Sequence, residues 1–269
     1  MANGENDQET QTHGMHPSFA RVIERKRLLK QKLSGIRHIV GIYSAKGGVG
    51  KTTTAVNIAY GLKENGLKVG LLDLDVDCPN ITMFTGIDNV KVNVTTFPIK
   101  PIDVEGIKVM STATVVDELK RPIIWRGPMI TKMIGELLEN TDWGELDYLV
   151  LDLPPGTSDS PLTIMQLVEC SFVIVTTPQR ISALNSVRSG LMAKRMNAHL
   201  LGVIENMSSG EASKSTLNVV NELQTTLLGI VKLDKAFDEN SDSGRIASMF
   251  DKRIAQEYQE IIRKLLSPS

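Results

Sequence analysis

The stretch Ile39-Val-Gly-Ile-Tyr-Ser-Ala-Lys-Gly-Gly-Val-Gly-Lys-Thr-Thr-Thr54 decides the fold. It begins as an apolar run, passes into glycines and Lys51-Thr52, and continues into a helix-like segment over residues 55–62. Strand, glycine-rich loop and helix in that order are the context that a phosphate-binding loop needs. Because glycine has no Cβ, successive backbone N–H groups can turn toward an anion, and the helix N-terminus adds partial positive charge. The stretch therefore predicts a nucleoside-triphosphate site.

The side chains of this loop supply the remaining parts of such a site. Lys51 brings a full positive charge to the β- and γ-phosphates, and the Thr52 hydroxyl can ligate Mg²⁺. The loop departs from G-x-x-x-x-G-K-[ST], since Ala45 replaces the first glycine and a second lysine, Lys46, lies inside it. A glycine-rich turn without chemistry is the alternative, which the flanking elements disfavour. The predicted nucleotide-binding residues of the loop are Gly47, Gly48, Val49, Gly50, Lys51, Thr52 and Thr53.

Two apolar runs further along the chain end in aspartates. Residues 67–74 lead into Asp73-Leu-Asp-Val-Asp77, and residues 148–151 lead into Asp152 and then Gly156. Continuous apolar runs are typical of parallel strands buried on both faces, and ligands bind at the carboxyl ends of such strands. We expect Asp152 to bind Mg²⁺ through water and the Gly156 N–H to contact the γ-phosphate.

Strands and helices alternate along the rest of the chain. Residues 171–176, 200–204 and 227–233 are predicted strands, and residues 181–196 and 254–266 are predicted helices. This alternation predicts an α/β fold with a doubly wound, mostly parallel sheet and helices on both faces. We expect a disordered tail over residues 1–18, a basic helix over 19–35, and a single P-loop domain over 36–269.

The predicted basic helix allows two interpretations. Residues 19–35 combine a narrow apolar stripe with six lysines and arginines. A basic amphipathic helix can lie on a membrane or on nucleic acid. A narrow stripe favours a helix that packs on the main domain and leaves its charges in solvent, which is the interpretation we prefer.

Composition limits the partners and the compartment. The chain has 269 residues, is 41% hydrophobic, and has a net charge of −1, which gives no global attraction for nucleic acid or anionic membranes. It has two cysteines, Cys78 and Cys170, and no apolar run near the ~20 residues that cross a bilayer. With no secretory signal evident, we expect a cytoplasmic protein without a transmembrane segment or a clear nucleic-acid partner.

Residues 46–53, Lys-Gly-Gly-Val-Gly-Lys-Thr-Thr, resemble the deviant Walker A loop of MinD/ParA-type ATPases. The resemblance implies a homodimer that hydrolyses ATP, in which Lys46 reaches the nucleotide of the partner subunit. It implies that Asp75 orients the attacking water, so that the catalytic residues are Lys46, Lys51 and Asp75. It places Mg²⁺ near Thr52, Asp73 and Asp152.

Several further stretches resemble the Mrp-type ATPases, the branch of these proteins that carries iron–sulfur clusters to apoproteins. They include Trp125-Arg-Gly-Pro-Met129, Pro154-Pro-Gly-Thr-Ser-Asp159 and Leu201-Gly-Val-Ile-Glu-Asn-Met-Ser208. The resemblance covers the chain from about residue 36 to its end. It implies that Asn206 contacts the adenine, and that apoproteins are the protein partners.

The sequence departs from the Mrp pattern at the cluster ligands. Mrp-type carriers place a Cys-x-x-Cys pair shortly after the Asn-Met-Ser segment, so that two subunits supply four thiolates. Here the region reads Ser208-Ser-Gly-Glu-Ala-Ser-Lys-Ser215, and serine hydroxyls are poor substitutes for thiolates. We interpret Cys170 as a buried apolar residue, which leaves Cys78 as the candidate ligand, with only two thiolates per dimer.

Two functions remain open from the sequence. The first is a Mg-dependent ATPase homodimer that acts in iron–sulfur cluster assembly or transfer to apoproteins. The alternative is a MinD/ParA-like nucleotide switch that recruits or positions a protein partner without carrying a cluster. A small-molecule kinase on the same scaffold is disfavoured, because the sequence shows no pocket for an acceptor substrate.

Overall fold

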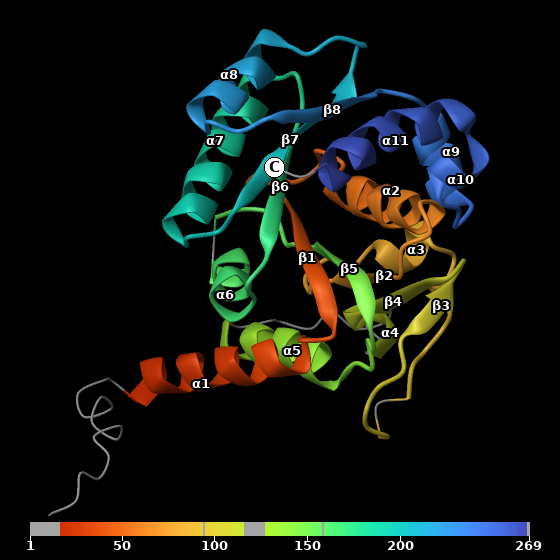
Figure 1. Cartoon of the computed structure of the whole chain (residues 1–269). Helices are drawn as coiled ribbons and strands as arrows, with labels where there is room; N and C mark the ends of the chain where they lie inside the picture. Colours follow the sequence, from red (N-terminus) through yellow and green to blue (C-terminus); the bar gives the residue numbers. More distant parts are fainter. Residues whose placement is uncertain (1–16, 94, 116–126, 158, 268–269) are drawn as a thin grey trace, which may run out of the picture.

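The computed structural model describes residues 17–93, 95–115, 127–157 and 159–267 (Figure 1). In this part of the chain, eight strands form one sheet in the order β3-β4-β2-β5-β1-β6-β7-β8, with β3 antiparallel to β4 and the other pairs parallel. The strands are β1 (Ile36–Tyr43), β2 (Val69–Asp73), β3 (Ile102–Val104), β4 (Ile107–Ser111), β5 (Leu146–Asp152), β6 (Ser171–Thr176), β7 (Leu200–Ser208) and β8 (Leu227–Lys232). The predicted mostly parallel α/β fold is confirmed.

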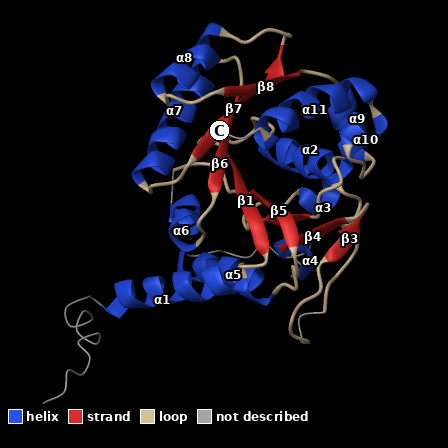
Figure 2. Ribbon diagram, viewed as in Figure 1, coloured by secondary structure: helices blue, strands red, loops and turns tan. Residues whose placement is uncertain are grey.

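Helices cover both faces of the sheet (Figure 2). One hydrophobic cluster lies between the sheet and the helices on one of its faces. These helices are α1 (Pro17–Lys32), α4 (Thr112–Val115), α5 (Gly127–Asn140), α6 (Asp159–Leu167), α7 (Arg180–Arg195) and α8 (Lys214–Glu222). A second cluster fills the other face beneath α2 (Lys51–Glu64), α3 (Ile81–Phe84), α9 (Ala236–Asp242), α10 (Ala247–Phe250) and α11 (Lys252–Leu266). The sheet is therefore the middle of three layers, which is the doubly wound arrangement that the sequence predicts.

The register of the central strands brings the carboxyl ends of β1, β2 and β5 to one edge. Asp152 of β5 lies opposite Ile42 of β1 on one side and opposite Asp73 of β2 on the other. The interior leaves little space there: a Cβ on Gly41 would lie 2.7 Å from the Phe172 ring and 2.9 Å from Leu153. The lack of a side chain at Gly41 thus lets β1 lie against Phe172 of β6 and Leu153 after β5.

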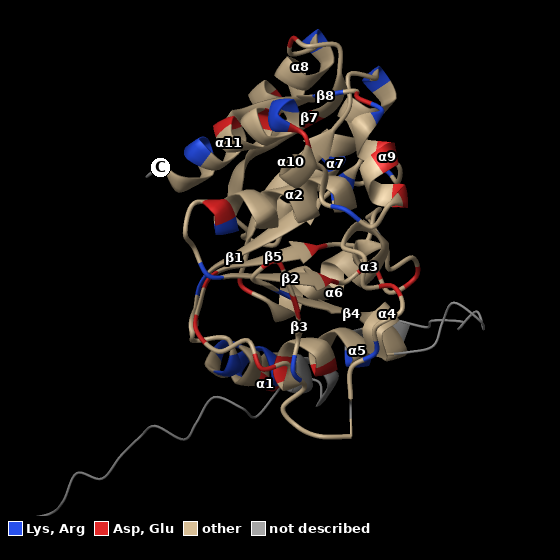
Figure 3. Ribbon diagram, turned by 90° about the vertical axis from the view of Figure 1, so that its right-hand side faces the viewer, with Lys and Arg blue, Asp and Glu red and all other residues tan. Residues whose placement is uncertain are grey.

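Helix α1 docks on the main domain. Leu29 and Leu33 are buried, and α1 contacts α5 and α6. Arg25 pairs with Glu139 at 2.8 Å and Lys30 with Glu169 at 2.8 Å, and Figure 3 shows basic and acidic residues interspersed along α1 and its neighbours. These basic groups are engaged with carboxylates of the same chain, which agrees with a packed helix better than with a helix presented to membrane or nucleic acid.

No helix within the described ranges is both long and apolar enough to span a bilayer. Most of the predicted tail, residues 1–16, lies outside the described residues, as do Trp125 and Arg126.

Candidate functional site

The loop between β1 and α2 has the backbone shape that its glycines predict. Gly48 and Gly50 have φ of 74° and 80°, in the left-handed region that disfavours residues with a Cβ. Gly50 is the N-cap of α2, and a Cβ there would clash with the side-chain amide of Asn206. The loop therefore needs glycine at position 50 both for its conformation and for the approach of β7.

Lys51 and Thr52 converge on one carboxylate. Lys51 Nζ lies 2.7 Å from Asp152 Oδ1, and Thr52 Oγ1 donates to Asp152 Oδ2 at 2.6 Å. Asp152 is fully buried and Lys51 is 7% exposed. Burial acts to lower the pKa of Lys51, but the charge and hydrogen bond of Asp152, together with the charges of Asp75 and Asp73, outweigh burial and raise that pKa. Residues 100 positions apart in the sequence thus form a charged cluster at the start of α2.

Asp73 is buried among protein donors. Its carboxylate accepts the backbone N–H of Asp75 at 3.1 Å and of Ile81 at 3.1 Å, and the Ser111 hydroxyl at 3.2 Å. Burial, and then repulsion from Asp152, raises the pKa of Asp73 to about 8. The geometry shows Asp73 holding the loop after β2 in place; its predicted part in the Mg²⁺ site stays a prediction.

Asp75 lies at the mouth of the same cluster. Its Oδ2 is 3.8 Å from Lys51 Nζ, and its Oδ1 accepts the N–H of Cys78 at 3.3 Å. Burial raises the pKa of Asp75 to about 6, although the charge of Lys51 acts in the opposite direction. The structure therefore brings together Lys51, Thr52, Asp73, Asp75 and Asp152, all of which the sequence proposes for one site.

Gly156 is held by the strand that leads into the phosphate loop. Its N–H donates to the carbonyl of Ser44 at 3.1 Å, and its carbonyl accepts the Tyr43 hydroxyl at 2.7 Å. A phosphate contact through the Gly156 N–H therefore requires the bond to Ser44 to open. The sequence predicts the loop but not this competing acceptor.

Lys46 and Asn206 link the phosphate loop to the segments that follow β6 and end β7. Lys46 Nζ lies 3.4 Å from Oε1 of Gln179, the N-cap of α7. The Asn206 amide donates to the Val49 carbonyl at 2.9 Å and is buried. The sequence analysis does not identify Gln179 and Ser111 as neighbours of the site. The only feature of the sequence that indicates them is their position, since Ser111 ends β4 and Gln179 follows β6 at this edge of the sheet.

The cysteines do not form a metal-binding group. Cys78 is exposed, and burial together with the charge of Asp75 raises the pKa of its thiol; burial raises the pKa of the half-buried Cys170 thiol. Within the described ranges, no three His, Cys, Asp or Glu side chains are grouped to hold a metal ion. Thiolates are the form that binds metal, and the role of Cys78 as a cluster ligand stays a prediction.

The loop after β7 is fixed by a buried acid. Glu205 is inaccessible to solvent and accepts the backbone N–H of Ser213 at 3.0 Å and its hydroxyl as well. Ser213 in turn caps α8 by accepting the N–H of Thr216. Burial acts to raise the pKa of Glu205, but hydrogen bonds from Ser213, Thr216 and Ser208 together lower that pKa and favour the charged carboxylate. The segment that lacks the cysteine pair is thus an ordered, polar loop.

A glycine loop at a helix N-terminus, a lysine and a hydroxyl beside a strand-end aspartate, and a parallel sheet define a P-loop nucleotide-binding protein. Residues 35–266 match the family model "ParA: NUBPL iron-transfer P-loop NTPase", and the chain belongs to that family. The predicted identification with the iron–sulfur carrier branch is therefore confirmed.

Relatives support this assignment. The chain is 38% identical over 253 residues to the iron–sulfur cluster carrier protein of Methanocaldococcus jannaschii, covering 88% of this chain and 87% of that one. It is 39% identical to the iron–sulfur cluster transfer protein NUBPL of Dictyostelium discoideum, covering 89% and 79%. The named relatives favour the iron–sulfur branch over the alternative of a positioning switch.

Solved structures resemble the fold. A nucleotide-binding protein from Archaeoglobus fulgidus, in complex with ADP, superposes with a TM-score of 0.73 at 31% identity, covering 87% of this chain and 95% of that one. The cell division ATPase MinD of Pyrococcus furiosus superposes with a TM-score of 0.65 at 19% identity, covering 85% and 98%, which supports the fold alone.

If Asp75 orients the attacking water, its pKa of about 6 sets the acid limb of the reaction. Protonation removes the acceptor that holds the water. We therefore expect kcat/KM for ATP hydrolysis to fall about tenfold per pH unit below this value. Steady-state rates across pH measure the limb. Asp75→Asn should abolish activity, whereas Asp77→Asn, at an exposed neighbouring carboxylate, should keep the limb. A profile that stays flat through pH 6 in the folded protein would contradict the assignment.

Proposed function

We propose that two copies of this chain enclose Mg·ATP, hydrolyse it, and use the cycle to act in iron–sulfur cluster assembly or transfer to apoproteins. The observation that carries the proposal is the convergence of Lys51 and Thr52 on the buried carboxylate of Asp152, directly behind the phosphate loop. Membership of an iron-transfer P-loop family supports the cargo class.

The oxygen atoms of this cluster suit a magnesium ion. The Thr52 hydroxyl and the Asp152 carboxylate are 2.6 Å apart and are hard donors of the kind Mg²⁺ prefers. Thr52 would hold the ion directly and Asp152 through water, with Asp73 and its donors fixing the neighbouring loop. When bound, the ion neutralises developing charge on the phosphate oxygens.

The chain's own groups would position the reactants. The loop amides and the α2 N-terminus bind the phosphates. The Lys51 ammonium, which contacts Asp152, would also contact the phosphates. Asp75, 3.8 Å from Lys51, orients the water for in-line attack. The Gly156 N–H leaves the Ser44 carbonyl for the γ-phosphate and returns after hydrolysis, so the loop after β5 reports which nucleotide is bound.

Lys46 is the group that would make the site shared between two subunits. Among the described residues, its ammonium has one hydrogen bond, the 3.4 Å contact with Gln179, and it lies at a partly exposed position of the loop. Moving it away from Gln179 exchanges one long hydrogen bond to a neutral amide oxygen for a contact with charged phosphate. A charged group that is lightly held at the site entrance suits a role at a second copy's nucleotide.

The cluster ligands would have to come from a partner. Cys78 follows β2 and Cys170 precedes β6, and the pKa of each thiol is raised. The loop before α8 has serines in place of the cysteine pair. An iron–sulfur cluster usually needs four thiolates. We propose that a thiolate-bearing protein supplies them, and that this chain contributes the nucleotide cycle.

The shared site predicts a dimer that depends on Lys46. Asp75→Ala should bind ATP without hydrolysing it and accumulate as a dimer. The double variant Asp75→Ala/Lys46→Ala should remain monomeric, because the phosphates lose the charge from the second subunit. Light scattering with Mg·ATP measures the mass, and Lys68→Ala in place of Lys46→Ala is the control at an exposed lysine away from the loop. A dimer that forms equally well without Lys46 would contradict the shared site.

The ligand assignment predicts that the chain alone holds no stable cluster. After anaerobic reconstitution, iron and acid-labile sulfide should be near background for the wild type and for Cys78→Ala. The variant Ala212→Cys/Ser215→Cys, which introduces a Cys-x-x-Cys pair beside the Ser213 cap, should gain both and serves as the positive control. A stable cluster on the wild type that disappears in Cys78→Ala would overturn the need for a partner's thiolates.

A further inference from the structure

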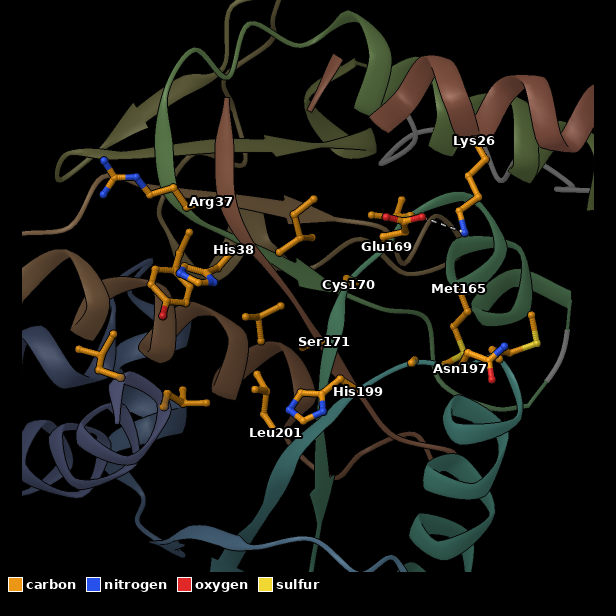
Figure 4. Close-up of a pocket in the computed structure, with 18 of the residues that line it drawn as sticks. Lys26, Arg37, His38, Met165, Glu169, Cys170, Ser171, Asn197, His199 and Leu201 are labelled. Carbon is orange, nitrogen blue, oxygen red and sulfur yellow. Dashed lines mark ion pairs between the residues drawn. The ribbon is translucent and has the colours of Figure 1, made fainter. Parts of the chain in front are cut away.

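A cavity of about 820 Å³ lies at the amino ends of β1, β6 and β7, at the edge of the sheet opposite the phosphate loop (Figure 4). Its lining includes the four consecutive β1 residues Arg37–Val40, the β6 approach Glu169–Ser171, and Ala198 and His199 before β7. Side chains of consecutive strand residues point to opposite faces. A cavity that touches four of them in a row therefore meets the edge of the strand.

That edge is unpaired because β6 starts late. On one side, β1 pairs with β5 from Ile36 onward, whereas on the other side pairing with β6 begins only at Val40, opposite Ser171. Beyond β6, β7 begins at Leu200, opposite Phe172. Strands two places apart in a sheet are about 9.6 Å apart, so the space in line with β6 is one strand wide. We call this space the β1–β7 slot.

Apolar side chains line both faces of the slot. Met165, Val168 and Met196 line one side and belong to the hydrophobic cluster under α6 and α7. Leu201 and Leu265 line the other side and belong to the cluster beneath α11. An extended chain in the slot would direct alternate side chains to these two sides.

The side beneath α11 also presents two histidines. The His38 ring stacks on Tyr148 with ring centroids 4.8 Å apart, and His199 lies across the slot from β1, where Figure 4 shows its ring beside Leu201. Neither imidazole has a hydrogen bond or ion pair to another described residue. Two other basic residues of the cavity are already neutralised, since Lys26 pairs with Glu169 at 3.3 Å and Arg37 with Asp147 at 2.8 Å. The histidines therefore add N–H donors that no carboxylate of the described residues engages.

We propose that the β1–β7 slot binds an extended acidic segment of a partner protein, which adds to β1 as a strand, with an acidic side chain near His38 and His199 and apolar neighbours toward Met165 and Val168. Backbone hydrogen bonds to an open strand edge give affinity in this mode, and alternate side-chain contacts give specificity. The unpaired β1 residues that line the cavity, Arg37–Ile39, span about 10 Å and accept a short peptide. The site does not involve the nucleotide, so its test is independent of the proposed ATPase.

The test uses fluorescein-labelled Val-Glu-Val-Glu-Val and measures anisotropy with the full chain. We expect saturable binding that is at least about tenfold tighter than that of Val-Lys-Val-Lys-Val, because the imidazoles donate to carboxylates. The same acidic probe N-methylated at every residue should not bind, since it has no backbone donors for β1. His38→Ala/His199→Ala should weaken the acidic probe about tenfold.

A matched pair of bulky substitutions locates the binding. Ala198→Trp fills the slot and should abolish binding, whereas Lys194→Trp, at an exposed site on α7, should leave it unchanged. Circular dichroism and thermal unfolding check that both variants fold. If Ala198→Trp does not fold, the binding of the acidic probe to His38→Ala/His199→Ala still tests the proposal. No saturable binding, or binding that survives N-methylation or Ala198→Trp, would overturn the proposal. If Ala198→Trp instead abolished self-association in sedimentation, the slot would bind a second copy and the proposal would be wrong.

Discussion

The ion pair between Lys51 and Asp152 is the contact on which the candidate site depends. Both groups are buried, and two charges removed from water are stable together only when each satisfies the other. Removing one partner of such a pair typically costs about 3–5 kcal/mol, because the remaining charge has no water to solvate it. Asp152 is held by β-sheet pairing on both sides, so the pair fixes where the phosphate loop and α2 begin relative to the sheet.

The other acidic groups are arranged around this pair in a graded way. Asp73 is deepest and is fixed by three protein donors, while Asp75 is nearer the surface and keeps an oxygen facing Lys51. Their pKa values, about 8 and about 6, are raised mainly by burial. As the pH rises through these values, each carboxyl loses its proton at a cost to the folded protein, since their ordinary pKa in an unfolded chain is near 4. A cation bound beside these carboxyls would favour their charged forms and lower both pKa values.

Much of this could be predicted from sequence because it rests on local pattern. The glycine loop with Lys51 and Thr52, and the apolar runs that end in Asp73 and Asp152, predict these strands and the residues that meet at the sheet edge. The contacts of Gly156 with Ser44 and of Lys46 with Gln179 could not be predicted, since they join segments more than a hundred residues apart and depend on exact strand ends. Strand β7 also extends to Ser208 rather than stopping at Ile204, as pairing with β8 continues past the apolar run.

The β1–β7 slot and the hydrogen bonds of Glu205 with Ser213 are further features that could not be predicted from the sequence. The slot exists because β6 starts opposite Val40 instead of Ile36, which is a property of register and not of composition. The absence of a Cys-x-x-Cys pair is visible in the sequence, but only the structure shows that Glu205 and Ser213 order the loop in its place. In our proposal, the chain has kept the nucleotide machinery of its family and depends on other proteins for the cluster ligands.

The most direct test of the account is calorimetric titration of ATP into the wild-type chain with Mg²⁺ and with EDTA. The account predicts that Mg²⁺ tightens binding by at least about tenfold, since Thr52 and Asp152 provide hard oxygens for the ion at the phosphates. It predicts that Thr52→Ala reduces this difference severalfold while ATP still binds in EDTA. Equal affinity with and without Mg²⁺ in the wild type would contradict the account.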